Sequence, residues 1–390
     1  MMVAPKDLAS LADAIADAAE AREPMEIVGG GALRAMGRPV TAPRTLSTRN
    51  LVKIHYYEPD ELVISLEAGV PLDLVEQTLA AAGQQLAFEP PDFSKLLGTD
   101  AQRTIGGTIA ANLSGPRRFH AGAARDHLLG FVAVNGRGEV VKSGGRVVKN
   151  VTGYDLSKLV AGSWGTLAVL STVTLKVLPR PEASASLVVL GLSPEAAVGL
   201  FARALSRPLD VTGAAWLPRG PWGERPAAVL RVEGFARSVV ERLDLVADLD
   251  EGAPSLRLDQ TESEALWRAL RDGEPLAAAG DAAIWRISVP PMAGPDLLAA
   301  LPGSAAYLDW AGGLAWLAVA PEPALGVGRI AAVLARVGGH ASLVRAPLEL
   351  RAAIDAPPAL SGPLAALTAR VKDAFDPLRV LNPGRLYRDL

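Results

Sequence analysis

Three short segments rich in glycine and other small residues constrain this chain more than any other feature of its sequence. They read VGGGALRAMG from Val28, TIGGTIAANLSG from Thr104 and VAGSWGT from Val160. Because glycine has no Cβ atom, backbone N–H groups in such segments can approach an anion closely. The sequence therefore predicts a fold whose loops can hold a ligand through the backbone.

The first segment follows a predicted strand at residues 26–29 and places Gly29, Gly30 and Gly31 directly after it. A phosphate group fits such a turn. The segment is not a Rossmann dinucleotide fingerprint, because Arg34 stands where the third glycine is required, and the chain has no GK[ST] P-loop. Taken alone, three glycines are more often a tight turn than a cofactor site, so both interpretations stay open at this point.

The second and third segments add positions of the same kind. Gly106, Gly107 and Thr108 open a predicted helix whose free N–H groups and dipole favour a pyrophosphate. That helix is predicted to end at Asn112, Ser114 and Gly115. The third segment supplies small residues ahead of a strand, which leave room for a flat ligand: Gly162, Ser163, Gly165 and Thr166.

The remaining pattern indicates an α+β fold. An amphipathic helix is predicted at the start, with Leu8, Leu11, Ile15 and Ala18 on one face. Strands are predicted at 26–29, 46–51, 62–67, 131–135, 139–144 and 167–178, and a hairpin turn at 135–138. Pro71 and Gly83 bracket a predicted helix, and a further helix at 361–375 is followed by a turn rich in proline and glycine.

The chain of 390 residues is too long for one core of ordinary size. After the sequence PRPEA at 179–183 the composition shifts to helices rich in Leu, Ala and Arg, interrupted by Pro and Gly. We therefore expect three parts: a first domain at 1–182, a second α+β domain at 183–342, and a C-terminal segment at 343–390.

Composition excludes several classes of function. With 39 basic and 42 acidic residues the chain lacks the basic excess of a nucleic-acid-binding protein. It contains no cysteine, so it cannot supply a catalytic thiol, a disulfide or the thiolate ligands of an iron–sulfur cluster. The sequence predicts neither a signal peptide nor a membrane span, and we expect a cytoplasmic location, with contact to the inner membrane only through partners.

The order of the motifs GGG, IGGTIAANLSG, RDHLLG and KNVTGYDLSKLVAGSWGTLAVLSTVTLKVLPRP resembles the FAD-binding domain of the vanillyl-alcohol oxidase and p-cresol methylhydroxylase (PCMH-type) superfamily. The resemblance covers residues 25–180. It resumes in VKDAFDPLRVLNPGRLY, which is similar to the closing segment of the D-lactate and glycolate dehydrogenase branch. Within that branch, the variant SGPRR at 114–118 and the compact middle part are most similar to the small FAD-binding subunits of bacterial glycolate oxidases.

This resemblance implies a PCMH-type domain of two α+β subdomains, a smaller cap-like α+β domain and a C-terminal segment that returns towards the flavin. It implies that the first glycine loop and the IGG segment wrap the pyrophosphate of FAD. The segment around Arg125 and Asp126, and the strand at Val169, would meet adenine or flavin. The implied cofactor-binding residues are Gly29, Gly30, Gly31, Ala32, Gly106, Gly107, Thr108, Asn112, Ser114, Gly115, Gly122, Arg125, Asp126, Gly162, Gly165, Thr166, Val169 and Asn382.

The first glycine loop indicates how FAD would be held. In the resembled superfamily, covalent attachment uses a histidine in or near that loop, or a tyrosine or cysteine elsewhere. The loop here reads GGGALR, and the four histidines, at positions 55, 120, 127 and 340, lie outside it. We therefore expect non-covalent FAD. His120 lies next to implied cofactor residues, and Asn382 can equally serve a turn or the flavin.

The catalytic relatives oxidise 2-hydroxy acids with a histidine-rich metal cluster in the cap domain. With His340 the only histidine after residue 127, the sequence predicts no metal site of that kind and leaves the catalytic residues unassigned. Arginine can still bind a carboxylate by a bidentate fork, and the candidates are Arg117, Arg118, Arg345 and Arg351.

Three functional hypotheses follow. The leading one is an FAD-containing subunit of a glycolate or D-lactate oxidising complex, with a larger FAD-binding subunit and an iron–sulfur subunit as partners. The second is a self-sufficient FAD oxidase or dehydrogenase of an alcohol or hydroxy acid, and the third is a structural subunit with little or no flavin. If the chain works at an interface, four tryptophans in the second domain are candidate anchors, although packing in the core is the more common role for each of them: Trp216, Trp222, Trp310 and Trp316.

Overall fold

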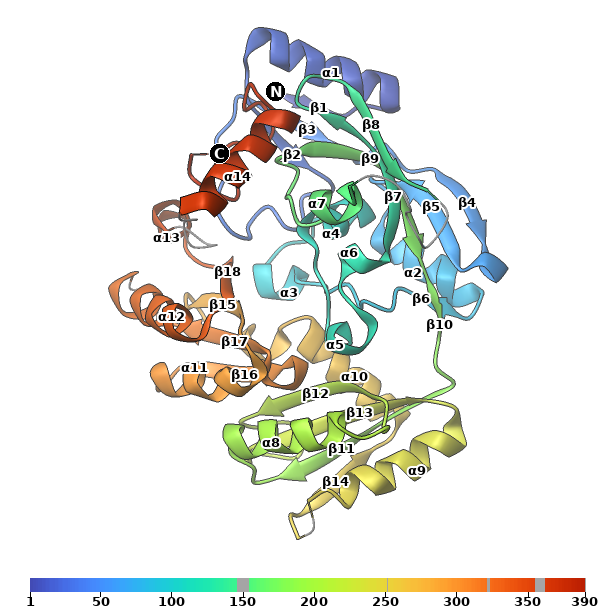
Figure 1. Cartoon of the computed structure of the whole chain (residues 1–390), viewed down its shortest axis with the longest axis vertical. Helices are drawn as coiled ribbons and strands as arrows, with labels where there is room; N and C mark the ends of the chain where they lie inside the picture. The colour runs from blue at the N-terminus through green and yellow to red at the C-terminus, as the bar shows by residue number, and fades with distance from the viewer. Residues whose placement is uncertain (146–153, 251, 321–322, 355–361, 390) are drawn as a thin grey trace.

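The first part of the chain is built around two small sheets. The computed structural model describes residues 1–145, 154–250, 252–320, 323–354 and 362–389. A three-stranded parallel sheet has the order β1 (Met2–Val3), β3 (Arg44–Ser47) and β2 (Met25–Val28). A five-stranded antiparallel sheet has the order β4 (Ile54–Glu58), β5 (Val63–Glu67), β9 (Ala168–Lys176), β7 (Leu128–Asn135) and β8 (Val140–Gly144). These sheets form the upper part of the molecule in Figure 1.

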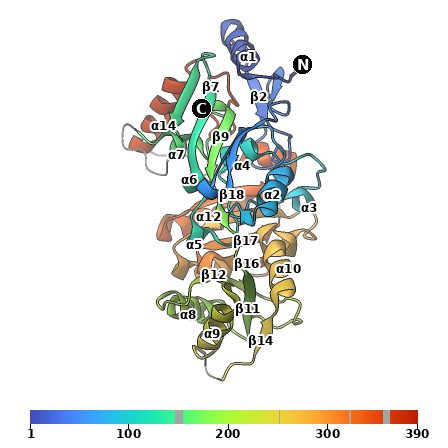
Figure 2. The same ribbon diagram turned by 90° about the vertical axis from the view of Figure 1, so that its right-hand side faces the viewer.

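The N-terminal helix α1 (Leu8–Ala21) covers one edge of these sheets. Asp7 caps it by accepting a hydrogen bond from the Ser10 backbone N–H. The predicted amphipathic face is confirmed, since Leu11, Ile15 and Ala18 are buried against Leu46 and Val169, among other residues. This packing explains why the helix stays attached at the top of the molecule in Figure 2.

Short helices connect the strands and surround the space between the sheets. They are α2 (Leu72–Ala81), α3 (Ser94–Leu97), α4 (Ile105–Ala111), α5 (Arg118–Ala121), α6 (Ala124–His127) and α7 (Leu156–Val160). The two-residue strands β6 (Gln84–Gln85) and β10 (Leu178–Pro179) pair where the chain leaves this part.

The second part is one large antiparallel sheet of eight strands in the order β14-β11-β13-β12-β16-β17-β15-β18. Its strands are β11 (Ala183–Leu190), β12 (Val211–Leu217), β13 (Ala227–Gly234), β14 (Ser255–Leu258), β15 (Ala283–Ser288), β16 (Ala305–Asp309), β17 (Leu314–Val319) and β18 (His340–Arg345). Its helices are α8 (Pro194–Leu205), α9 (Ala236–Ala247), α10 (Gln260–Arg271), α11 (Gly294–Ala300) and α12 (Pro323–Val337).

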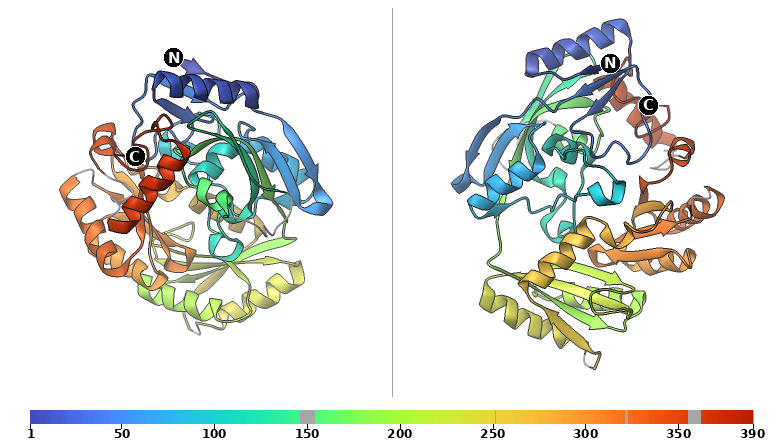
Figure 3. Two further views of the ribbon diagram at one scale, coloured as in Figure 1. Left: turned by 45° about the horizontal axis from the view of Figure 1, so that its top comes forward. Right: turned by 180° about the vertical axis from the view of Figure 1, so that it is seen from behind.

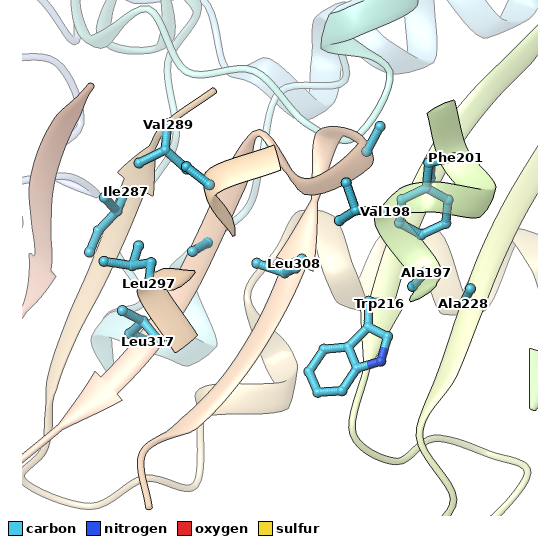
Figure 4. Packing of buried hydrophobic residues seen from close by; sticks show 14 of the residues in the cluster. Ala197, Val198, Phe201, Trp216, Ala228, Ile287, Val289, Leu297, Leu308 and Leu317 are labelled. Atoms are coloured by element: carbon cyan, nitrogen blue, oxygen red, sulfur yellow. The ribbon is translucent and has the colours of Figure 1, made fainter. Parts of the chain in front are cut away.

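The two faces of this sheet have different partners. One face is covered by α8, α9, α11 and α12, and Figure 4 shows Val198, Phe201, Leu297 and other side chains of that apolar layer. The opposite face packs on α10 and on residues of the first part, among them Phe93 and Leu113. The apolar contact across this second face joins the sheet to the first part. The view from behind in Figure 3 shows the large sheet below the first part.

The C-terminal segment contains α13 (Leu348–Ala353) and α14 (Gly362–Phe375) and then returns to the first part. The buried Lys372 ammonium donates to the Asp376 carboxylate at 2.7 Å and to the backbone oxygens of Thr166 and Leu381. Residues Val380 and Leu381 join the core under α1. This ion pair and its carbonyl partners hold the returning segment beside the third glycine-rich segment.

The expected elements are largely present, with differences in position. The strand expected at 46–51 ends at Ser47, because residues 48–51 form a turn in which the Leu51 N–H donates to the Thr48 carbonyl. The expected hairpin at 135–138 joins β7 to β8, as predicted. The KNVTG part of the third motif block lies outside the described residues. Within the described residues, no helix is long and apolar enough to cross a membrane.

Candidate functional site

A cavity lies at the place where all three glycine-rich segments meet. It comprises about 1070 Å³ of space that no atom fills, part of it open to solvent. Nine of the predicted cofactor residues line it: Gly29, Gly30, Gly31, Ala32, Gly106, Gly107, Thr108, Gly165 and Val169. A tenth, Asn382, joins them from the C-terminal segment.

Two neighbouring glycines of this cavity differ in what a side chain at their position would meet. At Gly106 an added Cβ atom would lie 2.5 Å from the Cβ of Ala68, so this glycine allows close packing of α4 against the chain after β5. At Gly107 the only described atom within 4 Å of an added Cβ is the Thr104 hydroxyl oxygen, at 3.2 Å. The protein around Gly107 therefore has room for a side chain, and that room lies at the cavity.

One polar group of the cavity lacks a hydrogen-bond partner among the described residues. The Ser163 hydroxyl is buried and has no hydrogen-bond partner among the described residues. The Thr104 hydroxyl accepts from the Gly107 N–H at 3.3 Å and caps α4. A buried hydroxyl without a partner is costly, so the Ser163 side chain fits a ligand that supplies a hydrogen bond.

Arg34 and Arg385 are among the residues that line the cavity. Arg34 forms an ion pair with Glu26, and both line the cavity. The Arg385 guanidinium lies 4.7 Å from the centre of the Trp164 ring and donates to the carbonyls of Arg38 and Leu33. Burial lowers the pKa of Arg385 to about 10, which leaves it charged at neutral pH.

Asn382 lines the cavity, yet its side chain is committed to the backbone. Its Oδ1 accepts from the Ile27 N–H at 2.7 Å, and its Nδ2 donates to the carbonyls of Ile27 and Trp164. Its backbone is left-handed, with φ of 44°. Asn382 therefore ties together β2, the third glycine-rich segment and the returning C-terminal segment.

The other predicted cofactor residues do not line this cavity. They lie behind it, where the Asn112 side chain accepts from the Arg125 N–H and the Ser114 hydroxyl accepts from the Ala124 N–H. These contacts fix the short helix α6 against the end of α4. The residues outside the cavity lining are Asn112, Ser114, Gly115, Gly122, Arg125, Asp126, Gly162 and Thr166.

The four histidines are scattered. His55 lies near Glu67, His120 bonds Asp210 at 2.7 Å across the two parts of the chain, and His127 is buried against Phe88. Burial lowers the pKa of His127, and burial followed by nearby arginines lowers the pKa of His340. Within the described ranges, no group of three His, Cys, Asp or Glu side chains is placed to hold a metal ion.

A second cavity between the two parts is lined by charged groups that pair with one another. Arg117 donates to both Glu233 oxygens at 2.9 and 2.8 Å, and Arg231 pairs with Glu89 at 2.9 Å. Although burial alone would raise it, Arg231 and Arg117 hold the pKa of Glu233 at about 2. Arg117, one of the predicted carboxylate ligands, is thus already engaged by the protein.

Two further predicted arginines are engaged in the same way. Arg345 donates to the carbonyls of Leu96, Ala277 and Gly280. Arg351 donates to those of Gly37 and Arg34. Neither guanidinium is paired with a carboxylate among the described residues, but their donors are used by backbone oxygens.

The remaining candidate, Arg118, faces a tryptophan together with an arginine that sequence reasoning missed. Its guanidinium carbon lies 4.3 Å from the centre of the Trp310 ring, and that of Arg286 lies 4.6 Å from the same centre. Arg286 stands on β15, which carries no motif that marks a site. Only the pairing of β15 with β17 and β18 brings it to this position.

The tryptophans of the second part are not surface anchors. Trp216, Trp310 and Trp316 are 9%, 7% and 2% exposed and belong to the two cores of the large sheet. Trp222 is half-buried against the second of these cores. Of the two alternatives, core packing is therefore confirmed for the three buried residues, and the role of interface anchor is wrong for them, because apolar packing within the chain covers them.

Comparison with known proteins agrees with this arrangement. Residues 1–144 match the family described as "FAD binding domain". The glycolate oxidase subunit GlcE of Escherichia coli is 34% identical over 381 residues, which is 98% of this chain and 97% of that protein. The glycolate oxidase subunit GlcD of Bacillus subtilis is 29% identical over 191 residues, 48% of this chain and 39% of that protein.

Solved structures show the same fold. A structure of alkyldihydroxyacetonephosphate synthase aligns with a TM-score of 0.69 at 16% identity and covers 98% of this chain and 75% of that one. The match extends through both the glycine-rich part and the large sheet. The expected fold, a PCMH-type FAD-binding domain followed by an α+β domain, is confirmed.

Proposed function

The chain belongs to the family of glycolate oxidase subunit GlcE, and from this membership we propose that it is the FAD-binding subunit of a complex that oxidises glycolate to glyoxylate. The chain is an FAD-dependent oxidoreductase subunit by homology. We further propose the substrate, the mode of FAD binding and the partners of this subunit. FAD, when bound, supplies the acceptor for the two electrons that leave a hydroxy acid on oxidation.

The observation that carries the proposal is the cavity built by the glycine-rich segments. It combines the backbone of Gly29–Gly31 in its lining, free space beside Gly107 and a buried Ser163 hydroxyl without a partner among the described residues. Flavin cofactors need an extended site of this kind, with backbone donors for the pyrophosphate and few polar groups around the ring. We assign FAD to this cavity, which ten of the predicted residues line.

Non-covalent attachment is supported by the chemistry of the lining. The residues that line the cavity in the described part of the chain include no histidine, tyrosine or cysteine. These are the side chains that would form a bond to the flavin ring. We therefore propose that hydrogen bonds and packing alone hold FAD.

The partners follow from what this chain does not contain. Its sequence has no cysteine, so an iron–sulfur cluster held by thiolates must belong to another chain. We propose a larger FAD-binding subunit, of the kind named GlcD in Bacillus subtilis, and an iron–sulfur subunit as partners. Electrons from glycolate would then pass through this assembly.

The test is to express the tagged chain alone and together with its genomic neighbours. We expect the chain alone to contain about one FAD, which acid precipitation releases into the supernatant, and a second flavoprotein and a cysteine-rich protein to elute with it. A folded chain without flavin would contradict the FAD assignment. Elution as a lone monomer with all neighbours folded, together with bleaching of its flavin by glycolate, would instead favour the self-sufficient oxidase.

A further inference from the structure

Two positively charged side chains share one aromatic ring at the boundary between the two parts of the molecule. The guanidinium carbons of Arg118, from α5, and Arg286, from β15, lie 4.3 and 4.6 Å from the centre of the Trp310 ring. Their separation cannot exceed the sum of these two distances. The positive charge of Arg118 acts on Arg286 and lowers its pKa, so an anion beside the pair would stabilise the arrangement.

The protein itself supplies little compensating charge. No ion pair involves either arginine among the described residues, and the one hydrogen bond of the Arg286 guanidinium there goes to the Ser114 carbonyl at 3.0 Å. The nearest acid that acts on Arg286 is Asp309, whose pKa burial raises to about 7. Asp309 is therefore only partly ionised at neutral pH, and the acid that acts on Arg118, Asp126, is exposed and also faces Lys158.

Further positive charge surrounds the pair. Burial and then Arg118 lower the pKa of Arg286 to about 10, so it remains charged at neutral pH. Arg125, on the exposed side of α6, adds to the field, and it acts on His340 together with the other two arginines. His340 lies opposite Ser288 and Arg286 lies opposite Ser342, so the arginine and the histidine stand on one face of the sheet.

The backbone that presents Trp310 is strained. Trp310, Ala311 and Gly312 all have left-handed backbones, with φ of 53°, 58° and 99°. Such a run is unfavourable for residues with side chains and persists where the surroundings impose it. Here the Trp310 indole N–H donates to the Gly115 carbonyl at 2.9 Å, which holds the ring against the first part.

This cluster borders the proposed FAD cavity. Leu113 lines the cavity, and the next residue, Ser114, accepts the Arg286 hydrogen bond. Trp316, which Arg286 also faces at 5.9 Å, packs edge-on against Phe93, another residue of the cavity lining. An anion bound by the two arginines would therefore lie next to the bound cofactor.

We propose that Arg118 and Arg286, held on the two sides of the domain boundary by Trp310, form a binding site for the carboxylate of a small hydroxy or oxo acid on this chain itself. The planar guanidinium of arginine suits a carboxylate because it offers parallel N–H donors. The inference rests on the proposed function, since it places the acid beside the proposed FAD cavity. It requires no metal ion.

The test titrates the FAD-containing chain with oxalate, a two-carbon acid that cannot donate a hydride to flavin. We expect calorimetric binding and a shift of the flavin absorbance. Arg286→Gln should weaken oxalate binding about tenfold to a hundredfold and Arg118→Gln about tenfold, as expected for lost charge-assisted hydrogen bonds. If Arg286→Gln does not fold, Arg118→Gln alone tests the site. This variant should fold, because no described hydrogen bond involves the Arg118 guanidinium.

A matched control removes an arginine of the other cavity. Arg180 is exposed, lines the charged cavity and has no ion pair among the described residues, so Arg180→Gln removes one positive charge without touching Trp310. It should leave oxalate affinity unchanged. Equal weakening in the control, or inorganic phosphate binding as tightly as oxalate, would overturn the carboxylate site.

The same titration separates this inference from the proposed function. A chain that binds FAD but no oxalate contradicts the inference and leaves the function standing. A chain that binds no FAD but binds oxalate by calorimetry, with the expected loss in Arg286→Gln, contradicts the function and supports the site. Loss of FAD affinity in Arg286→Gln with unchanged oxalate affinity would assign the arginine to the cofactor and overturn the inference.

Discussion

Two arginines adjacent in the sequence have opposite environments. Arg117 is buried and donates to both oxygens of Glu233 in a network that also contains Arg231 and Glu89. Arg118 points to the Trp310 ring and has no carboxylate partner among the described residues. A buried charge that is paired within the chain serves the fold, whereas a charge left without a counterion is available to a ligand.

The two cavities differ in the same way. The charged cavity is lined by arginines and glutamates whose main groups bind one another. The glycine-lined cavity has the backbone of Gly29–Gly31 in its lining, space beside Gly107 and a Ser163 hydroxyl without a partner among the described residues. The comparison predicts that substitutions at the charged cavity change stability and that substitutions at the glycine-lined cavity change ligand binding.

The largest expected effect is at Gly107. Gly107→Val should abolish FAD binding while the chain stays folded, because the first carbon of the new side chain meets only the Thr104 hydroxyl outside its own helix backbone and Gly107 lines the cavity. The measurement is the flavin content of the purified variant, with circular dichroism to follow the fold. Full flavin occupancy in a folded Gly107→Val variant would show that this glycine only begins a helix.

The neighbouring glycine provides the matched control. In Gly106→Val the side chain would collide with Ala68, since its first carbon would lie 2.5 Å from the Ala68 Cβ atom. This variant should lose its fold as well as its flavin. Identical behaviour of the two variants would remove the distinction between packing glycines and cavity glycines.

The second effect is on stability at the charged cavity. Glu233→Gln should lower the free energy of unfolding by about 3 kcal/mol, because it leaves Arg117 and Arg231 with only Glu89 to compensate them. Denaturant unfolding measures this. Glu264→Gln, in the same cavity but outside the ion pairs of the described residues, should have an effect of less than about 0.5 kcal/mol. An equally small effect of Glu233→Gln would contradict the stabilising role of the Glu233 ion pairs.

The sequence was sufficient to predict the glycines that line the cavity, because the signals that mark them are local. Glycine after a strand, at 29–31, and glycine at the start of a helix, at Gly106 and Gly107, can be recognised from a few neighbouring residues. The limits of the prediction were also local: Asn112 and Ser114 occur in the same motif, but their side chains hold α6 rather than line the cavity.

The arginine pair could not be recognised in this way. Arg118 and Arg286 meet only because β15 occupies an interior position in the eight-stranded sheet and that sheet packs on the first part. Arg117 and Arg118 have the same residue type and are adjacent, so only their partners, Glu233 and Trp310, distinguish them. Those partners are more than a hundred residues away in the sequence.

The pH dependence of stability has opposite signs in the two regions. The pKa of Glu233 is lowered to about 2, so its stabilisation is present above its unfolded pKa of about 4.3 and is lost as pH falls towards 2. The pKa of Asp309 is raised to about 7, so its contribution is present below its unfolded pKa of about 3.9 and is lost as pH rises to 7.

Denaturant unfolding of two variants between pH 3 and pH 8 separates these contributions. Glu233→Gln should flatten the acid side of the stability profile, and Asp309→Asn should flatten the decline towards neutral pH, the latter by up to about 4 kcal/mol. Asp309→Asn keeps an oxygen that can accept from the Trp310 N–H, as Asp309 does at 2.7 Å. An unchanged profile in Asp309→Asn would contradict the buried, partly protonated state of this carboxyl group.

The most direct test of the contrast between paired and unpaired arginines is to compare Arg117→Gln with Arg118→Gln in two assays, thermal unfolding and oxalate titration. We expect Arg117→Gln to lower the melting temperature by several degrees and to keep the oxalate affinity of the folded protein. We expect Arg118→Gln to keep the melting temperature and to weaken oxalate binding about tenfold. Loss of stability in Arg118→Gln with unchanged oxalate affinity would contradict the contrast.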